Sequence, residues 1–306
     1  MPHPCLIKLI YQFQVDLLRY FTTFSWNSRL DKRSYPLCYL RSAKIYADII
    51  FLKEEDTMKK FIALIITFTL VVSFISTVHA KRGSDGQLNL LYWQAPSTMN
   101  PNLSGGTKEL EASSVVIEPL ARYDEKGNML PWLAEEIPTV ENGGVSKDLT
   151  SITWKIKKGI KWSDGSAFTA DDVVFTYEYC INPDTGCSHT NYYTGISSVK
   201  AIDRHTVKIE FNVAKPFPYS AFVGYNTPII QKAQFEGCQG AKAQECTKQN
   251  FYPIGTGPFK VVDFKPNDVI VFEANPNYRD PNKPAFNKMV FKGGGDATSA
   301  ARAVLE

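Results

Sequence analysis

The clearest hydrophobic pattern of the chain is an alternation near its middle. Ile152, Trp154 and Ile156 are separated by single polar residues, which is the period of a β-strand with one buried face. Asp164-Gly165 follows a few residues later and favours a tight reversal, because glycine adopts positive φ angles without steric cost. The pattern therefore predicts a strand followed by a turn.

A helix is predicted directly after this turn. Thr169 is placed to cap it, and Asp172, three residues on, completes a capping-box-like pair. Val173 and Tyr177 then contribute to an apolar face. Asp171 and Asp172 could instead be a pair of catalytic carboxylates, but neighbouring helical side chains point about 100° apart and do not converge on one substrate atom. We therefore interpret both carboxylates as stabilising the first turn of the helix.

The remaining patterns after residue 88 alternate between the two periods. They predict strands over 89–93, 207–211, 259–264 and 286–292, a helix over 109–123 that Pro119 ends or kinks, and a last helix that Asp296 begins.

No stretch of the sequence carries the residues of a known catalytic motif. Gly255-Thr256-Gly257 resembles a phosphate loop only in its glycines, because neither a Lys-Ser/Thr pair nor a helical pattern follows it. A nucleophile elbow and a HExxH zinc motif are also missing from the sequence. We therefore expect that the protein is not an enzyme.

The balance of charged residues differs between residues 1–80 and the rest of the chain. Of 34 basic and 31 acidic residues, residues 1–80 hold ten and six, which leaves 24 against 25 for the rest. The chain after residue 80 is nearly neutral and has no run of basic residues. Its charge therefore gives no electrostatic reason to expect nucleic-acid binding.

Residues 58–80 predict a secretory signal peptide. Lys59 and Lys60 precede an uncharged apolar run over 61–78, and Val78-His79-Ala80 fits a cleavage site. The alternative is a transmembrane anchor, since about 18 apolar residues nearly reach the length that spans a bilayer. Serines and threonines within the run reduce its hydrophobicity. We therefore expect a periplasmic protein that begins near Lys81.

Residues 1–57 precede this segment, although a signal peptide works from the amino terminus. They show no sustained periodicity, and we interpret them as an upstream extension from a misassigned start codon, with Met58 as the true start. The alternative is a cytoplasmic extension that turns the apolar run into a signal anchor.

Four cysteines follow the predicted signal peptide: Cys180, Cys187, Cys238 and Cys246. An even number in an exported chain predicts disulfides, and four cysteines permit three connectivities. We favour the two local pairs, Cys180 with Cys187 and Cys238 with Cys246, because each closes a short loop. A zinc site is the weaker alternative, because these spacings are poor for zinc. We expect neither a metal nor a cofactor.

Two blocks of the sequence are similar to landmarks of one protein family. The first is WSDGSAFTADDVVFTYE over 162–178, and the second is PIGTGPFKVVDFKPND over 253–268, followed by NPNY over 275–278. In this order and at this distance they resemble bacterial extracellular solute-binding proteins of family 5, the oligopeptide, dipeptide and nickel receptors of ABC importers. The resemblance runs from about Leu88 to the end of the chain.

The resemblance implies a fold and a division of the chain. The fold would be α/β and periplasmic-binding-protein-like, of the type II, three-subdomain class. Residues 81–117 would begin lobe I, residues 118–232 would form the small subdomain, and residues 233–306 would return to lobe I, truncated before the second large lobe. We expect a monomer if the chain is complete.

The resemblance also implies a function. The protein would be a periplasmic receptor that encloses a peptide and delivers it to an inner-membrane ABC permease. Alternatives are a nickel, haem or oligosaccharide receptor of the same family, or a truncated secreted fragment that binds nothing. An exported enzyme is the remote alternative.

Site residues follow from the family pattern. There the backbone just after the Met99-Asn100-Pro101 position pairs with the ligand, which assigns that role to Gly105, Gly106 and Thr107. Two consecutive glycines leave the backbone approachable, or they form only a flexible turn. Three tyrosines fall near places where family members present aromatic rings to the cleft, although each is also a candidate for the core or the surface: Tyr192, Tyr193 and Tyr225.

In the family, the position that Glu306 occupies lies well before the end of the chain. A chain that stops there is expected to bind its solute weakly or not at all, because well-formed pockets bury about 70 to 90% of a ligand. Titration calorimetry of residues 81–306 against a mixed di- to pentapeptide library tests this expectation, and the downstream genomic reading frame tests the receptor interpretation.

Overall fold

The computed structural model describes residues 82–295, 298–299 and 301–302. The predicted signal peptide, the segment ahead of it and Asp296 lie outside the described residues. Among the helices of the described part, none is long and apolar enough to cross a membrane.

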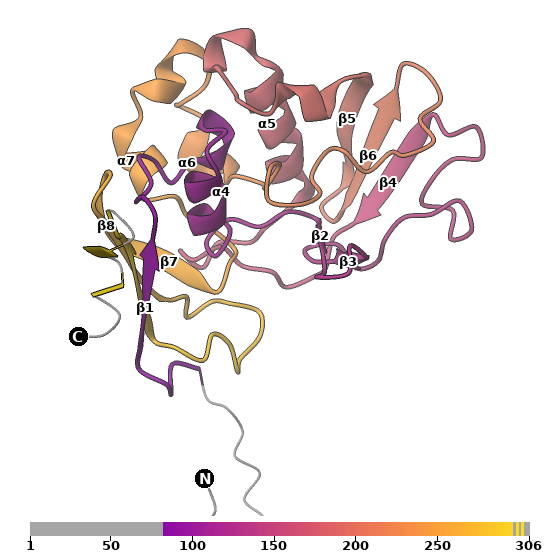
Figure 1. The fold of residues 1–306 in the computed structure, drawn as a ribbon. Helices are drawn as coiled ribbons and strands as arrows, with labels where there is room; N and C mark the ends of the chain where they lie inside the picture. Colours follow the sequence, from indigo (N-terminus) through magenta and orange to yellow (C-terminus); the bar gives the residue numbers. More distant parts are fainter. Residues whose placement is uncertain (1–81, 296–297, 300, 303–306) are drawn as a thin grey trace, which may run out of the picture. The chain divides into compact units, whose positions relative to one another are not determined.

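Short runs of strands and of helices follow one another along the described chain (Figure 1). The strands are β1 (Gln87–Tyr92), β2 (Ala121–Tyr123), β3 (Met129–Pro131), β4 (Ser151–Lys155), β5 (Ile196–Asp203), β6 (Thr206–Phe211), β7 (Phe259–Lys265), β8 (Val269–Ala274) and β9 (Lys288–Gly293). The α-helices are α4 (Thr107–Ser113), α5 (Ala170–Ile181), α6 (Lys232–Phe235) and α7 (Thr247–Phe251). Short 3₁₀ helices are η1 (Pro101–Leu103), η2 (Pro183–Thr185), η3 (Thr190–Tyr193) and η4 (Gly240–Gln244).

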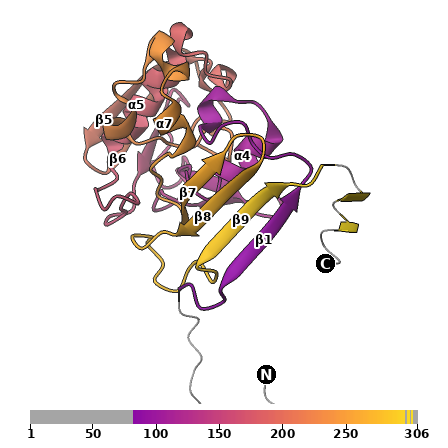
Figure 2. The same ribbon diagram turned by 90° about the vertical axis from the view of Figure 1, so that its left-hand side faces the viewer.

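One sheet joins the two ends of the described chain. Its strand order is β1-β9-β8-β7, and Figure 2 shows the four strands side by side. β1 runs parallel to β9, whereas β8 is antiparallel to both of its neighbours. Met289 and Phe291 of β9 are buried and lie opposite Leu88 and Leu90 of β1. The chain therefore leaves this sheet after β1 and returns to it at β7. The domain boundaries expected from the family resemblance remain a prediction.

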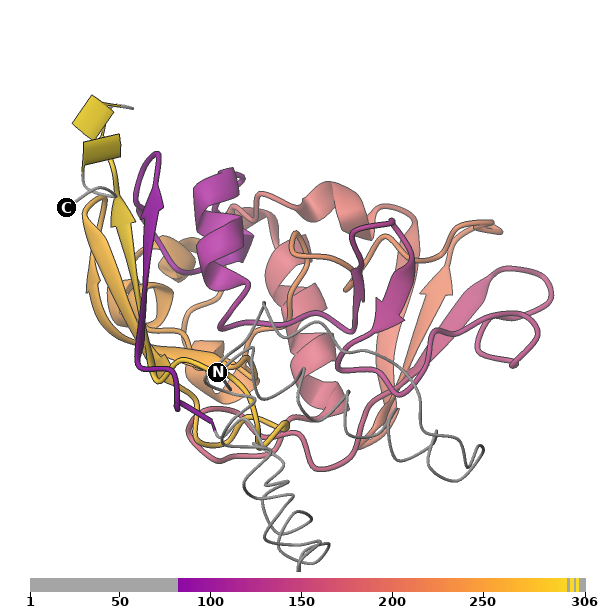
Figure 3. The ribbon, with the colours of Figure 1, turned by 60° about the horizontal axis from the view of Figure 1, so that its bottom comes forward.

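The intervening segment builds a second sheet in the order β4-β6-β5 and a small β2–β3 hairpin. Helix α5 packs against β5 and β6, and Figure 3 shows α4 and α5 lying between the two sheets. Ile152, Trp154 and Ile156, the alternating residues of the sequence, are all fully buried. The predicted strand is therefore confirmed, and its buried face forms part of the core beneath α5.

The predicted helix after residue 169 is confirmed as α5. The backbone N–H of Thr169 donates to Asp172 Oδ2 at 2.9 Å, and the other carboxylate oxygen accepts the N–H of Lys232 at 3.0 Å. Asp172 is buried whereas Asp171 is exposed. Burial raises the pKa of Asp172 despite these hydrogen bonds. The two carboxylates therefore do not face a common site.

The helix predicted over 109–123 is wrong in its second half. Helix α4 ends at Ser113, and Ala121–Tyr123 is strand β2, which pairs with Met129–Pro131. The turn between the two strands is held by Asp124, which accepts the N–H of Asn128 at 2.7 Å. Ile117 and Leu120 are buried in the observed structure as they would be on a helix face, so their spacing did not distinguish the two conformations.

Both favoured disulfides are confirmed. Cys180 is bonded to Cys187, with the Cα atoms 5.1 Å apart, and Cys238 is bonded to Cys246, with the Cα atoms 5.9 Å apart. The first bond ties the end of α5 to the segment before η3, and this segment leads to the candidate site.

Candidate ligand-binding site

A buried asparagine anchors the loop after β1. Asn100 is fully buried, and its side-chain amide donates to Asn250 Oδ1 at 2.9 Å and to the Tyr179 hydroxyl at 3.2 Å. Its side-chain oxygen accepts the backbone N–H of Asn102 at 3.1 Å and so begins η1. Burial raises the pKa of Tyr179 to about 12, so this hydroxyl keeps its proton. The loop is therefore fixed to both α5 and α7.

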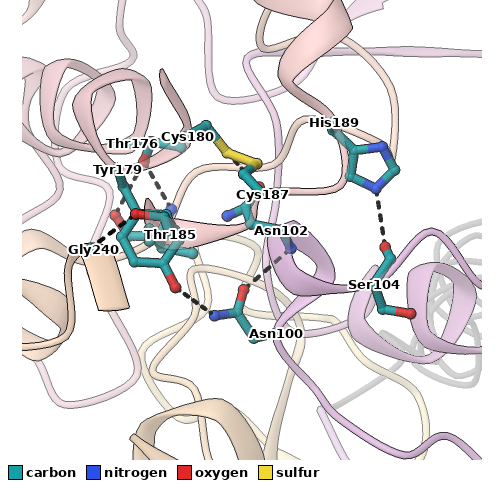
Figure 4. Close-up of a disulfide and its surroundings, with 11 residues drawn as sticks. Asn100, Asn102, Ser104, Thr176, Tyr179, Cys180, Thr185, Cys187, His189 and Gly240 are labelled. Carbon is teal, nitrogen blue, oxygen red and sulfur yellow. Dashed lines mark hydrogen bonds between the residues drawn. A yellow bond between two sulfur atoms is a disulfide. The ribbon is translucent and has the colours of Figure 1, made fainter. Parts of the chain in front are cut away.

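The Cys180–Cys187 disulfide holds a second segment against the same loop (Figure 4). The backbone N–H of Ser188 donates to the carbonyl of Asn102 at 2.8 Å. The next side chain, His189, lies with Nε2 3.0 Å from the carbonyl oxygen of Ser104. A carbonyl only accepts hydrogen bonds, so Nε2 carries the proton. Residues 187–189 thus run alongside residues 102–104.

The predicted ligand residues lie directly after this anchored stretch. Gly105 is exposed, and its backbone makes no hydrogen bond to any residue that the structure describes. Gly106 is the N-cap of α4, and Thr107, also exposed, is the first residue of the helix. The first N–H groups of a helix have no partner within it. The backbone of Gly105 and the N–H of Thr107 are therefore presented to solvent, whereas the N–H of Gly106 donates to Ser104 Oγ at 3.2 Å and the Gly106 carbonyl accepts the N–H of Glu109 at 3.1 Å.

A buried carboxylate lies against Gly106. Glu109 is 2% exposed and accepts both the backbone N–H and the hydroxyl of Ser97 at 2.9 Å. A side chain on Gly106 would collide with a carboxylate oxygen of Glu109. Gly106 thus allows Glu109 to link the first turn of α4 to the loop after β1.

The three predicted tyrosines have different environments. Tyr225 is 48% exposed and Tyr193 is 4% exposed. Tyr193 packs against Phe222 in the core, where burial raises its pKa, so this placement argues against direct ligand contact. Tyr192 is partly buried, and its hydroxyl accepts the side-chain N–H of Asn226, the neighbour of Tyr225, at 2.9 Å.

A chain of contacts links these places to the glycine loop. The ring of His189 packs edge-on against Tyr192, with the centroids 6.0 Å apart, and His189 in turn contacts Ser104. Ser104, His189, Tyr192 and Asn226 therefore connect Gly105 to Tyr225. The ligand roles of all six residues remain predictions.

His189 and Trp93 were not singled out from the sequence. Burial lowers the pKa of His189 more than the carbonyls of Ser104 and Pro101 raise it, so the ring is neutral at pH 7. Trp93, at the end of β1, is 56% exposed and packs against Tyr92. A tryptophan directly after an apolar strand is a sequence signal that could have pointed to Trp93. A lone histidine gives no such signal for His189.

The chemistry of this place does not come from a group of metal ligands. Within the described ranges, no three His, Cys, Asp or Glu side chains are grouped to hold a metal ion. An open cavity of about 630 Å³ lies elsewhere, between residues 157–160 and residues 279–281. None of the predicted ligand residues lines it. The candidate site is thus an exposed surface of backbone amides and neutral aromatic rings.

Comparison with known protein families identifies the family to which this chain belongs. Residues 128–306 match the family model described as "Bacterial extracellular solute-binding proteins, family 5 Middle". The chain belongs to family 5 of these proteins. The match covers more than half of the sequence and includes both blocks that carried the resemblance.

Individual family 5 proteins are similar to this chain in sequence and in structure. The oligopeptide-binding protein AppA of Bacillus subtilis is 30% identical over 210 residues, and the nickel-binding periplasmic protein of Escherichia coli is 29% identical over 208 residues. The structure of Bacillus subtilis AppA in complex with a nonapeptide matches with a TM-score of 0.65 at 29% identity and covers 74% of this chain. The fold is thus that of the type II periplasmic binding proteins.

The chain spans well under half the length of these relatives. It covers 36% of each of the two curated proteins and 43% of the AppA structure.

Proposed function

We propose that the protein is a periplasmic solute-binding receptor that takes a peptide and delivers it to an ABC permease of the inner membrane. The observation that carries this proposal is the exposed backbone of Gly105 and Thr107, presented on a loop whose preceding residues are fixed on two sides. The names of the relatives support the solute class, because AppA is an oligopeptide-binding protein.

Backbone pairing suits a receptor for peptides of varied sequence. Main-chain hydrogen bonds recognise the N–H and C=O groups that every peptide carries, whatever its side chains. The nearby exposed rings, Tyr225 and Trp93, add apolar surface that accommodates different side chains. A ligand would then shift an equilibrium between open and closed forms of the receptor according to its higher affinity for the closed form.

A nickel receptor is the second candidate, because the nickel-binding periplasmic protein of Escherichia coli is 29% identical to this chain. Peptide and nickel differ in what they require. A metal needs a set of ligating side chains, whereas a peptide uses the backbone groups described above. The candidate site favours the peptide.

Capture from a peptide pool tests the proposal. The protein, expressed from its complete reading frame and purified, is incubated with a mixed di- to pentapeptide library, and retained peptides are identified by mass spectrometry. We expect retention of many sequences with micromolar or tighter affinity in titration calorimetry. Binding of Ni²⁺ in equilibrium dialysis with no retained peptide would replace the peptide receptor by the nickel receptor.

A further inference from the structure

We propose that His189 is a positioning residue for ligand binding, which holds the carbonyl of Ser104 so that the backbone of Gly105–Thr107 faces the ligand. The proposal rests on the proposed function of this loop. His189 is 6% exposed, and its ring faces the backbone of Ser104 and Pro101. Its contacts connect the two parts of the candidate site.

Two contacts at Ser104 flank the exposed Gly105: His189 contacts the carbonyl of Ser104, and the hydroxyl of Ser104 accepts the N–H of Gly106 at 3.2 Å. The Nε2–H of the His189 ring donates to the carbonyl of Ser104 at 3.0 Å, one residue before Gly105. Gly105 itself forms no hydrogen bond to the described residues. Without the His189 contact, the peptide unit between Ser104 and Gly105 would lose its orienting partner, and Ser104 would keep a partly buried carbonyl without a donor.

The position of His189 is in turn set by the disulfide. Cys187 is bonded to Cys180 at the end of α5, and Ser188, between Cys187 and His189, donates to Asn102. The ring also packs against Tyr192 of η3. Figure 4 shows the imidazole pointing from this segment toward the carbonyl of Ser104. The helix α5, the disulfide and the imidazole thus form one support for the loop.

The pH dependence of this support follows from the surroundings of the ring. Residues 101–104 carry no ionisable side chain, and Tyr192 is the titratable group packed against the ring. Because burial lowers the pKa of His189, the unfolded segment takes up a proton at a higher pH than the folded one does. The neutral ring therefore contributes its full stability above the ordinary histidine pKa of about 6.5, and this contribution is lost as the pH falls from there through the folded pKa, because protonation places a charge on a buried ring. Nε2 still donates to the Ser104 carbonyl in both forms.

Amide NMR signals of the loop test the proposal. In the purified protein, the signals of Gly105 and Gly106 should shift with a midpoint below pH 6.5. His189→Gln retains a side-chain N–H donor and cannot titrate, so its loop signals should stay near their neutral positions at all pH values. His189→Phe keeps a ring against Tyr192 but has no donor, and should displace the loop signals and weaken peptide binding about tenfold. His205→Gln, in the β5–β6 turn, is the matched control and should behave like the wild type.

Loop signals of His189→Phe that superimpose on those of the wild type would overturn the inference. The inference would also be overturned if His189→Phe displaced the loop signals but bound the peptide as tightly as the wild type does. If the wild type itself retains no peptide, the proposed function fails, and the loop signals alone then decide whether His189 positions the loop.

Discussion

Replacing Gly255 with alanine is expected to prevent the protein from folding stably. A Cβ atom at this position would lie 2.5 Å from the carbonyl carbon of Val116 and would overlap its carbonyl oxygen. Both are backbone atoms, so no side-chain rotation relieves the clash. The backbone here is held on both sides, because Gly257 donates to the Val116 carbonyl at 2.8 Å and Ser163 donates to the Gly255 carbonyl at 2.9 Å.

The expected loss is at least about 3 kcal/mol of unfolding free energy, at the upper end of what overpacking costs. Chemical denaturation followed by circular dichroism measures it, and insoluble expression would agree. Gly237→Ala is the matched control, because a Cβ at 237 meets no atom within 4 Å and the residue does not have a positive φ. A Gly255→Ala protein as stable as this control would contradict the close approach of residues 255 and 116.

Replacing Arg279 with methionine is expected to destabilise the protein by roughly 3 to 5 kcal/mol, because it removes the guanidinium that is hydrogen-bonded to a buried carboxylate. Glu118 is fully buried, and Arg279 contacts it with two nitrogens, at 2.6 and 3.2 Å. Trp132 Nε1 and the hydroxyl of Thr256 donate to the same carboxylate at 2.6 and 2.9 Å. This cluster joins the β2–β3 hairpin to the segments on either side of β7 and β8.

A second substitution separates the buried charge from the lost packing. Glu118→Gln combined with Arg279→Met removes the charge and keeps an acceptor for Trp132, so the double variant should be more stable than Arg279→Met alone. Urea denaturation of the two variants and the wild type measures the difference. A cost below about 1 kcal/mol for Arg279→Met would show that the pair behaves like an exposed one.

The sequence predicted the elements that carry a local signal. Strand β4 and helix α5 followed from the alternation at Ile152 and from the cap at Thr169, since both signals lie within a few residues. The disulfides followed because a local pair needs only a short loop. Over 114–123 the spacing of the apolar residues fitted either a helix or a turn followed by a strand. Pairing with residues 129–131 selected the turn and strand.

Parts of the site depend on contacts between distant segments. His189 meets Ser104 across 85 positions of the sequence, and Arg279 meets Glu118 across 161. No local pattern contains such pairings. A hint did exist for Glu118, because an acidic residue between Ile117 and Pro119 in an apolar run needs a partner once it is buried. The family resemblance placed the glycine loop but not its support.

Thr107→Pro tests whether the backbone after the Asn100 loop binds the ligand. Proline is well tolerated at the first position of a helix, and Gly106, at φ −76° and ψ 130°, has the conformation that a following proline requires. The substitution therefore removes the backbone N–H of residue 107 without breaking the fold. Thr107→Ala removes the side chain and keeps this N–H.

Titration calorimetry of the two variants and the wild type, expressed from the complete reading frame, against a peptide retained from the pool is the deciding measurement. We predict that Thr107→Ala binds within about twofold of the wild type and that Thr107→Pro, at unchanged thermal stability, binds about tenfold more weakly. A Thr107→Pro protein that binds the peptide as tightly as the wild type would contradict backbone pairing at this loop.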